Sequence, residues 1–205
     1  MSGLTDGTEL PASTTPVTLS VATGTYAYDA THKHAVSSVS NQLSVDSYQY
    51  DANGNMTQRV EGGQTYTQTF DAENRLISVT VNSQTTQFIY DGDGNLIKKI
   101  NPDNSKTLYV GGLYEVNKNA GGTVTGTTTY YPASGAMRVN GTLYYVLKDH
   151  LGSASVVTDS SGNIVGEQRY YPFGETRLMT GTLYTDKLFT GQRNIAGLGI
   201  YHYQS

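Results

Sequence analysis

The chain has 205 residues, a length that suits one domain or a segment of a larger protein. Charged residues make up only 15% of it, the formal net charge is −4, and no basic cluster is denser than Lys98–Lys99, so we expect no nucleic-acid partner. No Cys is present, which excludes disulfides and thiolate metal sites, and no apolar run reaches the roughly 18 residues of a transmembrane helix. Abundant Gly (23) and Tyr (17) with many Thr, Ser, Asn and Gln are typical of an all-β secreted or cell-surface protein rich in turns.

Residues 1–25 form a polar, Pro-containing stretch without the basic start and apolar segment of a signal peptide. We expect a lead-in or linker here, either joined to a start codon or representing the cut end of a longer chain.

An aromatic–Asp pair recurs along the next part of the chain. Copies begin at Tyr28, Tyr50, Phe70 and Tyr90, with spacings of 22, 20 and 20 residues, and a weaker fifth copy begins at Tyr109. The first copy lacks the Gly-Asn turn of the others. A period near 20 leaves room for two strands of about 5–7 residues and two turns, and it is too short for a helical repeat. The pattern predicts an antiparallel array of β-hairpins over residues 26–118.

Two features of these hairpins bear on packing. The segment "RLISVTV" at 75–81 carries apolar residues on both faces of a strand, which indicates burial on both sides. Aromatic residues recur at related points of successive units, so that stacked hairpins would form a ladder of rings down one sheet face, each cross-strand pair contributing roughly 0.2–1 kcal/mol. These residues are Tyr26, Tyr28, Tyr48, Tyr50, Tyr66, Phe70, Phe88 and Tyr90.

After about residue 119 the strict repeat gives way to less regular hairpins. Turn signals fall at 133–135, 140–141, 149–152 and 159–163, a spacing that predicts a continuing meander. The stretch 174–199, rich in Gly and Thr, gives no clear pattern.

The sequences of both parts of the chain resemble those of a known family. The aromatic–Asp repeats resemble the YD repeats of the rearrangement-hotspot (RHS) family, and "DHLGS…TD…G…YPFGE…FTGQ…GLGIYHY" resembles the RHS-repeat-associated core that closes such proteins. The resemblance covers roughly residues 26–204 and divides the chain into YD-repeat hairpins at 26–118 and a core region at 119–205.

This resemblance implies a curved, spiralling β-sheet that forms part of a hollow shell. In bacterial toxins of the family the shell encloses a C-terminal effector, which is often released by an aspartate-dependent self-cleavage. Related repeats occur in insecticidal toxin complexes, wall-associated proteins and teneurins. The 205 residues contain neither the cleavage motif nor an effector, and about four repeats are too few to close a shell.

Two stretches mimic a calcium-binding loop. Asp51, Asn53 and Asn55 alternate as the first ligands of such a loop do, and 91–95 repeats the pattern. The match then fails, because the Gly precedes the third ligand and no Glu stands at the twelfth position. Asn-Gly and Asp-Gly instead supply the positive φ angles of primed hairpin turns, and the Asp accepts hydrogen bonds from N–H groups of its own turn. We therefore predict turns here and no metal or cofactor.

Two further groups could carry chemistry. Asp149, His150 and Ser153 have the residue types of a catalytic triad. Close neighbours on a turn cannot easily point at one another, so turn structure is the better interpretation. His32 and His34 alternate and could share a strand face as a zinc pair, although no third ligand is near. We predict no catalytic, cofactor-binding or metal site.

The sequence thus favours a non-enzymatic β-scaffold. The first hypothesis is a shell segment that encloses and helps deliver a C-terminal effector in bacterial competition, its partners being the effector or further repeats of a longer chain. The alternative is a surface or fibre-forming protein that self-assembles through open strand edges. A third is glycan contact through exposed Tyr rings.

Overall fold

The computed structural model describes residues 25–40 and 45–203. The predicted lead-in lies outside these ranges, except for Thr25. The described residues form one antiparallel sheet in which sixteen strands follow each other in sequence order, together with a separate two-stranded hairpin. The prediction of an all-β meander is confirmed, and the sheet stays open, since its first and last strands do not pair.

The first ten strands run through the aromatic–Asp repeats. They are β1 (Thr25–Tyr28), β2 (Val36–Ser40), β3 (Val45–Tyr50), β4 (Met56–Glu61), β5 (Gln64–Phe70), β6 (Leu76–Val81), β7 (Gln84–Tyr90), β8 (Leu96–Ile100), β9 (Lys106–Val110) and β10 (Tyr114–Lys118).

The remaining elements complete the sheet and add the separate hairpin. They are β11 (Val124–Tyr131), the 3-10 turn η1 (Pro132–Ser134), β12 (Ala136–Val139), β13 (Thr142–Lys148), β14 (Ala154–Asp159), β15 (Ile164–Tyr170), β16 (Thr176–Gly181), the 3-10 turn η2 (Phe189–Gly191), β17 (Arg193–Ile195) and β18 (Ile200–His202).

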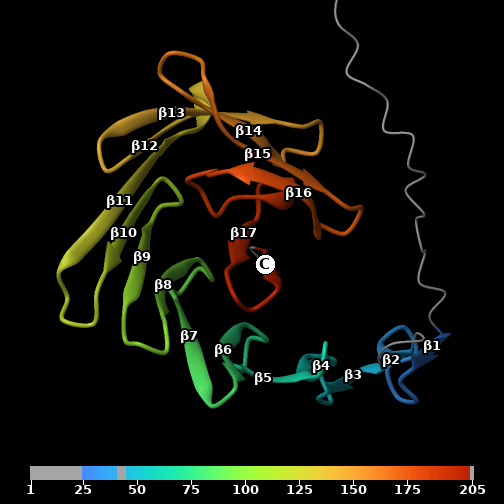
Figure 1. The fold of residues 1–205 in the computed structure, drawn as a ribbon. Coiled ribbons are helices and arrows are strands. Elements are labelled where there is room, and N and C mark those ends of the chain that lie inside the picture. The colour runs from blue at the N-terminus through green and yellow to red at the C-terminus, as the bar shows by residue number, and fades with distance from the viewer. Residues whose placement is uncertain (1–24, 41–44, 204–205) are drawn as a thin grey trace, which may run out of the picture.

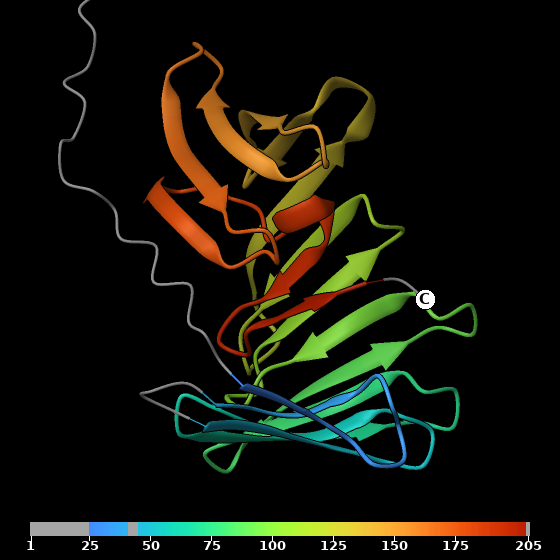
Figure 2. The same cartoon turned by 90° about the vertical axis from the view of Figure 1, so that its right-hand side faces the viewer.

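The long sheet is strongly curved. In Figure 1 the strands follow an arc from β1 to β16, and β17 lies inside that arc; Figure 2 shows the same hairpin lying against the inner side of the sheet. Strands twist with a fixed hand, so a long meander coils and acquires a concave and a convex face.

The aromatic–Asp motif ends one strand and begins a five-residue turn. In the turn at Asp51 the N–H of Gly54 donates to the Asp51 carbonyl at 3.0 Å, and one Asp51 carboxylate oxygen accepts from the N–H groups of Asn53 and Asn55, each at 2.9 Å. The carboxylate thus bonds to its own turn, as the sequence predicts. The same turn begins at Asp71, Asp91, Asn101, Asn119, Asp149, Asp159 and Tyr171.

The predicted turn type at this motif is wrong. Only Gly54 has a positive φ (85°) within the Asp51 turn, and the strand register shifts by one residue between Gln49 and Tyr50. This geometry is a type I turn followed by a bulge at a left-handed residue, not a primed turn. The left-handed position is where Gly is required, and Asn74 (φ 61°) takes it in the Phe70 copy.

Primed turns join other pairs of strands in the same sheet. The pairs Gly62–Gly63, Asn82–Ser83, Gly111–Gly112 and Asn140–Gly141 each have two consecutive positive φ angles and join adjacent strands directly. The supposed fifth copy at Tyr109 precedes one of these pairs, so Tyr109 lies inside β9 and does not begin a five-residue turn. That part of the repeat assignment is corrected.

The Tyr of the motif ties neighbouring strands together. The Tyr50 hydroxyl donates to the Val36 carbonyl at 2.8 Å, and the Tyr90 hydroxyl donates to the Leu76 carbonyl at 2.9 Å, in each case at the start of the preceding strand. Tyr170 does the same with the Ala154 carbonyl at 2.8 Å. Phe70 stands at the equivalent position without a hydroxyl, so the aromatic ring is shared by the copies and the hydrogen bond is not.

Burial concentrates on the concave face. In β6, Val79 is fully buried, whereas Ser78 and Thr80 on the other face are half-buried. The prediction that residues 75–81 are buried on both faces is therefore wrong, because the convex side of the sheet has no second layer in the described ranges (Figure 2).

Candidate functional site

The concave face is occupied by the end of the described chain. We call residues 182–203, which include η2, β17 and β18, the C-terminal segment. Ile195 (1% exposed) and Leu198 (5%) pack into one cluster with Val79, Phe88 and Tyr109 of the sheet. Leu183 packs into a second cluster with Met137 and Val157. The apolar core therefore lies between the sheet and the C-terminal segment.

A buried charge cluster joins the C-terminal segment to β10. The Arg193 guanidinium lies 2.8 Å from a Glu115 carboxylate oxygen and donates to Asp186 at 2.6 Å, and its carbon lies 4.0 Å from the centre of the Tyr109 ring. Arg193 and Glu115 side chains are about nine-tenths buried, while Asp186 is one-third exposed. Burial and the nearby Asp186 charge raise the pKa of Glu115, although Arg193 opposes the shift.

Two lysines lie close to this cluster. Lys187 donates to the Gly112 carbonyl at 2.5 Å, and its ammonium lies 4.0 Å from the centre of the Tyr130 ring. Burial lowers the pKa of Lys99 and of Lys187. Burying these charges costs desolvation free energy, and removing one partner leaves another buried charge unpaired. The cluster therefore favours a single position of the C-terminal segment on the sheet.

A second arginine, in the sheet, binds the C-terminal segment. Arg59 of β4 is 5% exposed and donates to the Leu198 carbonyl, 139 residues away along the chain. It also pairs with Glu61 and lies over the Tyr66 ring at 4.0 Å. The two arginines thus connect sheet and segment in opposite directions, Arg59 from the sheet and Arg193 from the segment.

The predicted aromatic ladder needs correction. Cross-strand registers place Tyr48, Arg59 and Tyr66 in one row of the concave face, so a ring lies opposite Arg59 and not opposite another ring. Within residues 25–40 and 45–203, no ring of the predicted set lies against another ring of the set. The rings that do stack join sheet to segment: Tyr90 with His202 at 5.7 Å and Tyr144 with Tyr184 at 4.4 Å.

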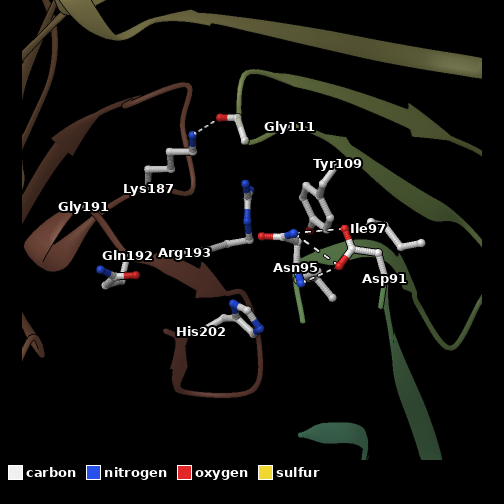
Figure 3. A pocket seen from close by; sticks show the side chains of 12 residues that line it. Asp91, Asn95, Ile97, Tyr109, Gly111, Lys187, Gly191, Gln192, Arg193 and His202 are labelled. Atoms are coloured by element: carbon white, nitrogen blue, oxygen red, sulfur yellow. Dashed lines mark hydrogen bonds between the residues drawn. The ribbon is translucent and has the colours of Figure 1, made fainter. Parts of the chain in front are cut away.

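A pocket of about 460 Å³ opens beside this seating. Figure 3 shows Arg193 and His202 rising from the β17–β18 hairpin toward Tyr109, with Lys187 above and the Asp91 turn opposite. Asp91 is engaged by its own turn, accepting from the Asn95 backbone at 2.9 Å and from its side chain at 3.0 Å. Among the residues that line the pocket, Arg193 and Lys187 hold the C-terminal segment against the sheet.

The structure places the residues weighed as a triad in another of the five-residue turns. The Asp149 carboxylate accepts from the N–H groups of Leu151 and Ser153, each at 2.9 Å. Ser153 is fully buried, and its hydroxyl accepts from the Thr190 N–H at 3.1 Å, whereas His150 is exposed. The Asp149 and Ser153 side chains thus serve the turn and its contact with η2.

The two histidines weighed as a zinc pair do not share a strand face. His32 and His34 lie in the turn between β1 and β2, and His32 Nδ1 lies 3.2 Å from Asp29. Asp29 accepts from the N–H groups of Thr31 and His32, and its own N–H donates to the Ala35 carbonyl at 2.8 Å, so this turn is longer than the five-residue turns of the later copies. No group of three or more acidic, His or Cys side chains that could hold a metal occurs within the described ranges.

Sequence reasoning missed the residues that build the site. Arg59, Glu115 and Arg193 are charged residues within strands of a chain that is poor in charge, and a charge at such a position is the available signal. His202 lies in the "GLGIYHY" motif, but nothing in the letters indicates which strand it contacts.

These features define a class of protein: a non-globular β-hairpin repeat scaffold, open at both edges, that holds a polypeptide on its concave face. The model of the RHS Repeat family matches residues 70–106, the hairpins from Phe70 to Lys106. This stretch of the chain is therefore similar to an RHS repeat. Comparison with curated proteins finds no match.

Solved structures share the fold of this chain. A crystal structure of TcdB2-TccC3 superposes with a TM-score of 0.65 and 20% identity over 88% of this chain. The Tc holotoxin pore of Photorhabdus luminescens gives 0.59 and 18%, and TcdB2-TccC3 without its hypervariable C-terminal region gives 0.56 and 18%, each over 88% of this chain. The match spans only 12–13% of those chains. The chain therefore has the fold of a small part of an RHS shell. No helix in the described ranges has the length and apolarity needed to cross a bilayer.

Proposed function

We propose that this chain is a shell segment that encloses a C-terminal effector and helps deliver it in bacterial competition. The observation that carries the proposal is the concave face, which already seats a polypeptide, the C-terminal segment, through a buried core and two arginine contacts. A scaffold with this role needs no catalytic residue, and its chemistry lies in what the inner face binds.

The comparisons supply further support. One similar structure is that of TcdB2-TccC3 without its hypervariable C-terminal region, so that protein has a variable region at its C-terminus. By analogy we propose a secreted or cell-surface location, and as partners an effector or further repeats of a longer chain. We also propose the division into YD repeats at 26–118 and a core region at 119–205, within one sheet that continues from β10 to β11.

Protease protection tests the enclosure. The complete reading frame, with all upstream repeats and everything after Ser205, is expressed and exposed to a broad-specificity protease. We expect the effector region to survive while shell loops are cut, and the same effector expressed alone to be degraded. Equal degradation in both preparations, or a reading frame with no further repeats and a stop codon directly after Ser205, would contradict the proposal.

A second function is favoured by the two open edges. Every residue of β1 and of β16 is exposed, and among residues 25–40 and 45–203 each of these strands pairs on one side only, which leaves an edge that could pair with another chain. Electron microscopy of the concentrated chain should then show filaments, and strictly monomeric particles would count against assembly. Tyr26 (58% exposed) and Tyr28 (59%) offer rings for glycan contact, a proposal to be dropped if glycan arrays show no binding.

A further inference from the structure

We propose that His202 makes the seating of the C-terminal segment sensitive to acid, so that protonation of its imidazole loosens the β17–β18 hairpin from the concave face. This goes beyond enclosure and holds whatever polypeptide the scaffold carries.

The geometry of the hairpin places two basic side chains in direct opposition. Arg193 of β17 and His202 of β18 are cross-strand partners in the register, two pairs away from the buried Ile195. The Arg193 guanidinium is permanently charged and is held in place by Glu115 and Asp186. Like charges directly opposite on a hairpin are destabilising, so a protonated His202 opposes the folded hairpin, whereas a neutral one does not.

The surroundings of His202 favour the neutral ring. It is stacked on Tyr90 with an interplanar angle of 25°, and it borders two pockets. Burial and the Arg193 charge lower the pKa of His202.

Other ionisable groups line the two pockets that His202 borders. In the first pocket they are Asp91, Tyr109, Lys187 and Arg193, and in the second they are Glu73, Arg75, Tyr90, Tyr201 and Tyr203. The two carboxylates among them are already engaged: Asp91 accepts from its own turn, and Glu73 pairs with Arg75. A proton on His202 therefore gains little attraction to offset its repulsion from Arg193.

The direction of the effect follows from linkage. Because the pKa of His202 is lower in the seated state than in an unseated one, the seated state binds fewer protons. Its stability is complete above the ordinary His pKa of about 6.5 and falls as the pH drops below that value. Glu115 acts in the opposite direction, since burial raises its pKa and its protonation favours the seated state.

Amide hydrogen exchange of the full chain measures this loosening. The reporters are the β17–β18 amides and the Asn194 N–H, which donates to the Asp186 carbonyl at 2.7 Å. After correction for intrinsic exchange, we expect opening of these amides to increase about two- to fivefold between about pH 7 and about pH 5. In His202→Phe, which keeps a ring against Tyr90, the increase should vanish or reverse, leaving the response of Glu115.

Two variants separate this role from general acid sensitivity. His150→Gln removes a histidine from an exposed turn and should keep the increase. His202→Gln provides a second test should the Phe variant fold poorly, and it too should lack the increase. A wild-type chain without the increase, or a variant at position 202 that retains it, overturns the proposal.

Discussion

Removal of the Arg193 charge should release the C-terminal segment from the concave face. In Arg193→Met a flexible apolar side chain fills the space of the arginine stem, but Glu115 loses its partner at 2.8 Å while it remains only 9% exposed. Deleting one partner of a buried ion pair typically costs about 3–5 kcal/mol. Two features reduce that cost here: the raised pKa of Glu115 lets it take up a proton, and Asp186 is one-third exposed and can be hydrated.

We therefore expect Arg193→Met to lower the free energy of unfolding by about 3 kcal/mol, near the low end of that range. The assay is urea denaturation followed by far-UV circular dichroism. The double variant Arg193→Met/Glu115→Gln should recover part of the loss, because no buried charge is then left without a partner.

Arg169→Met provides the matched control. Arg169 pairs with Glu167 at the same 2.8 Å distance, but its side chain is 66% exposed, so the loss should stay below about 1 kcal/mol. Equal losses in the Arg193 and Arg169 variants would refute the reasoning, because the buried cluster would then contribute no more than a surface pair.

The remaining predictions concern the repeat itself. Tyr90→Phe removes the donor to the Leu76 carbonyl and should cost about 1 kcal/mol, whereas Phe70→Tyr, which adds a hydroxyl at the equivalent position, should stabilise; urea denaturation of both tests the pairing. Ser83→Gly should raise the melting temperature by relieving a left-handed Ser (φ 60°) in a primed turn, a strain of about 1 kcal/mol, and an unchanged melting temperature would argue against that turn. The Asn95 side chain and backbone hold the pKa of Asp91 below its usual value, so stability should fall as the pH drops below about 4, and Asp91→Asn should flatten this fall in acid denaturation.

Much of the fold could be predicted because its information is local. The Asp, the left-handed Gly and the strand alternation around Tyr50 and Tyr90 each act within a few residues, and their period sets the hairpin array. The turn type was misjudged because a Gly after Asn serves both a primed turn and a bulged type I turn. The distinction depends on the φ angle of the preceding residue, which the letters do not specify.

The site could not be predicted because it depends on pairs far apart in the chain. Arg59 and Leu198 are 139 residues apart in the sequence, and Arg193 and Glu115 belong to different sheets. The curvature of the long sheet accumulates from many small strand twists, so no single segment encodes which inner residues face β17. The same cause explains the missing ladder: Tyr66, Phe88 and Tyr90 pack with residues of the C-terminal segment and not with one another.

Methyl-directed nuclear Overhauser measurements on the intact chain test the central claim most directly. If the concave face seats the C-terminal segment, the methyl groups of Ile195 and Leu198 should show cross-peaks to Val79 and Leu96 of the sheet, with which they share one core cluster. If Ile195 and Leu198 instead show only contacts within residues 182–203, the C-terminal segment is not seated and the account is contradicted.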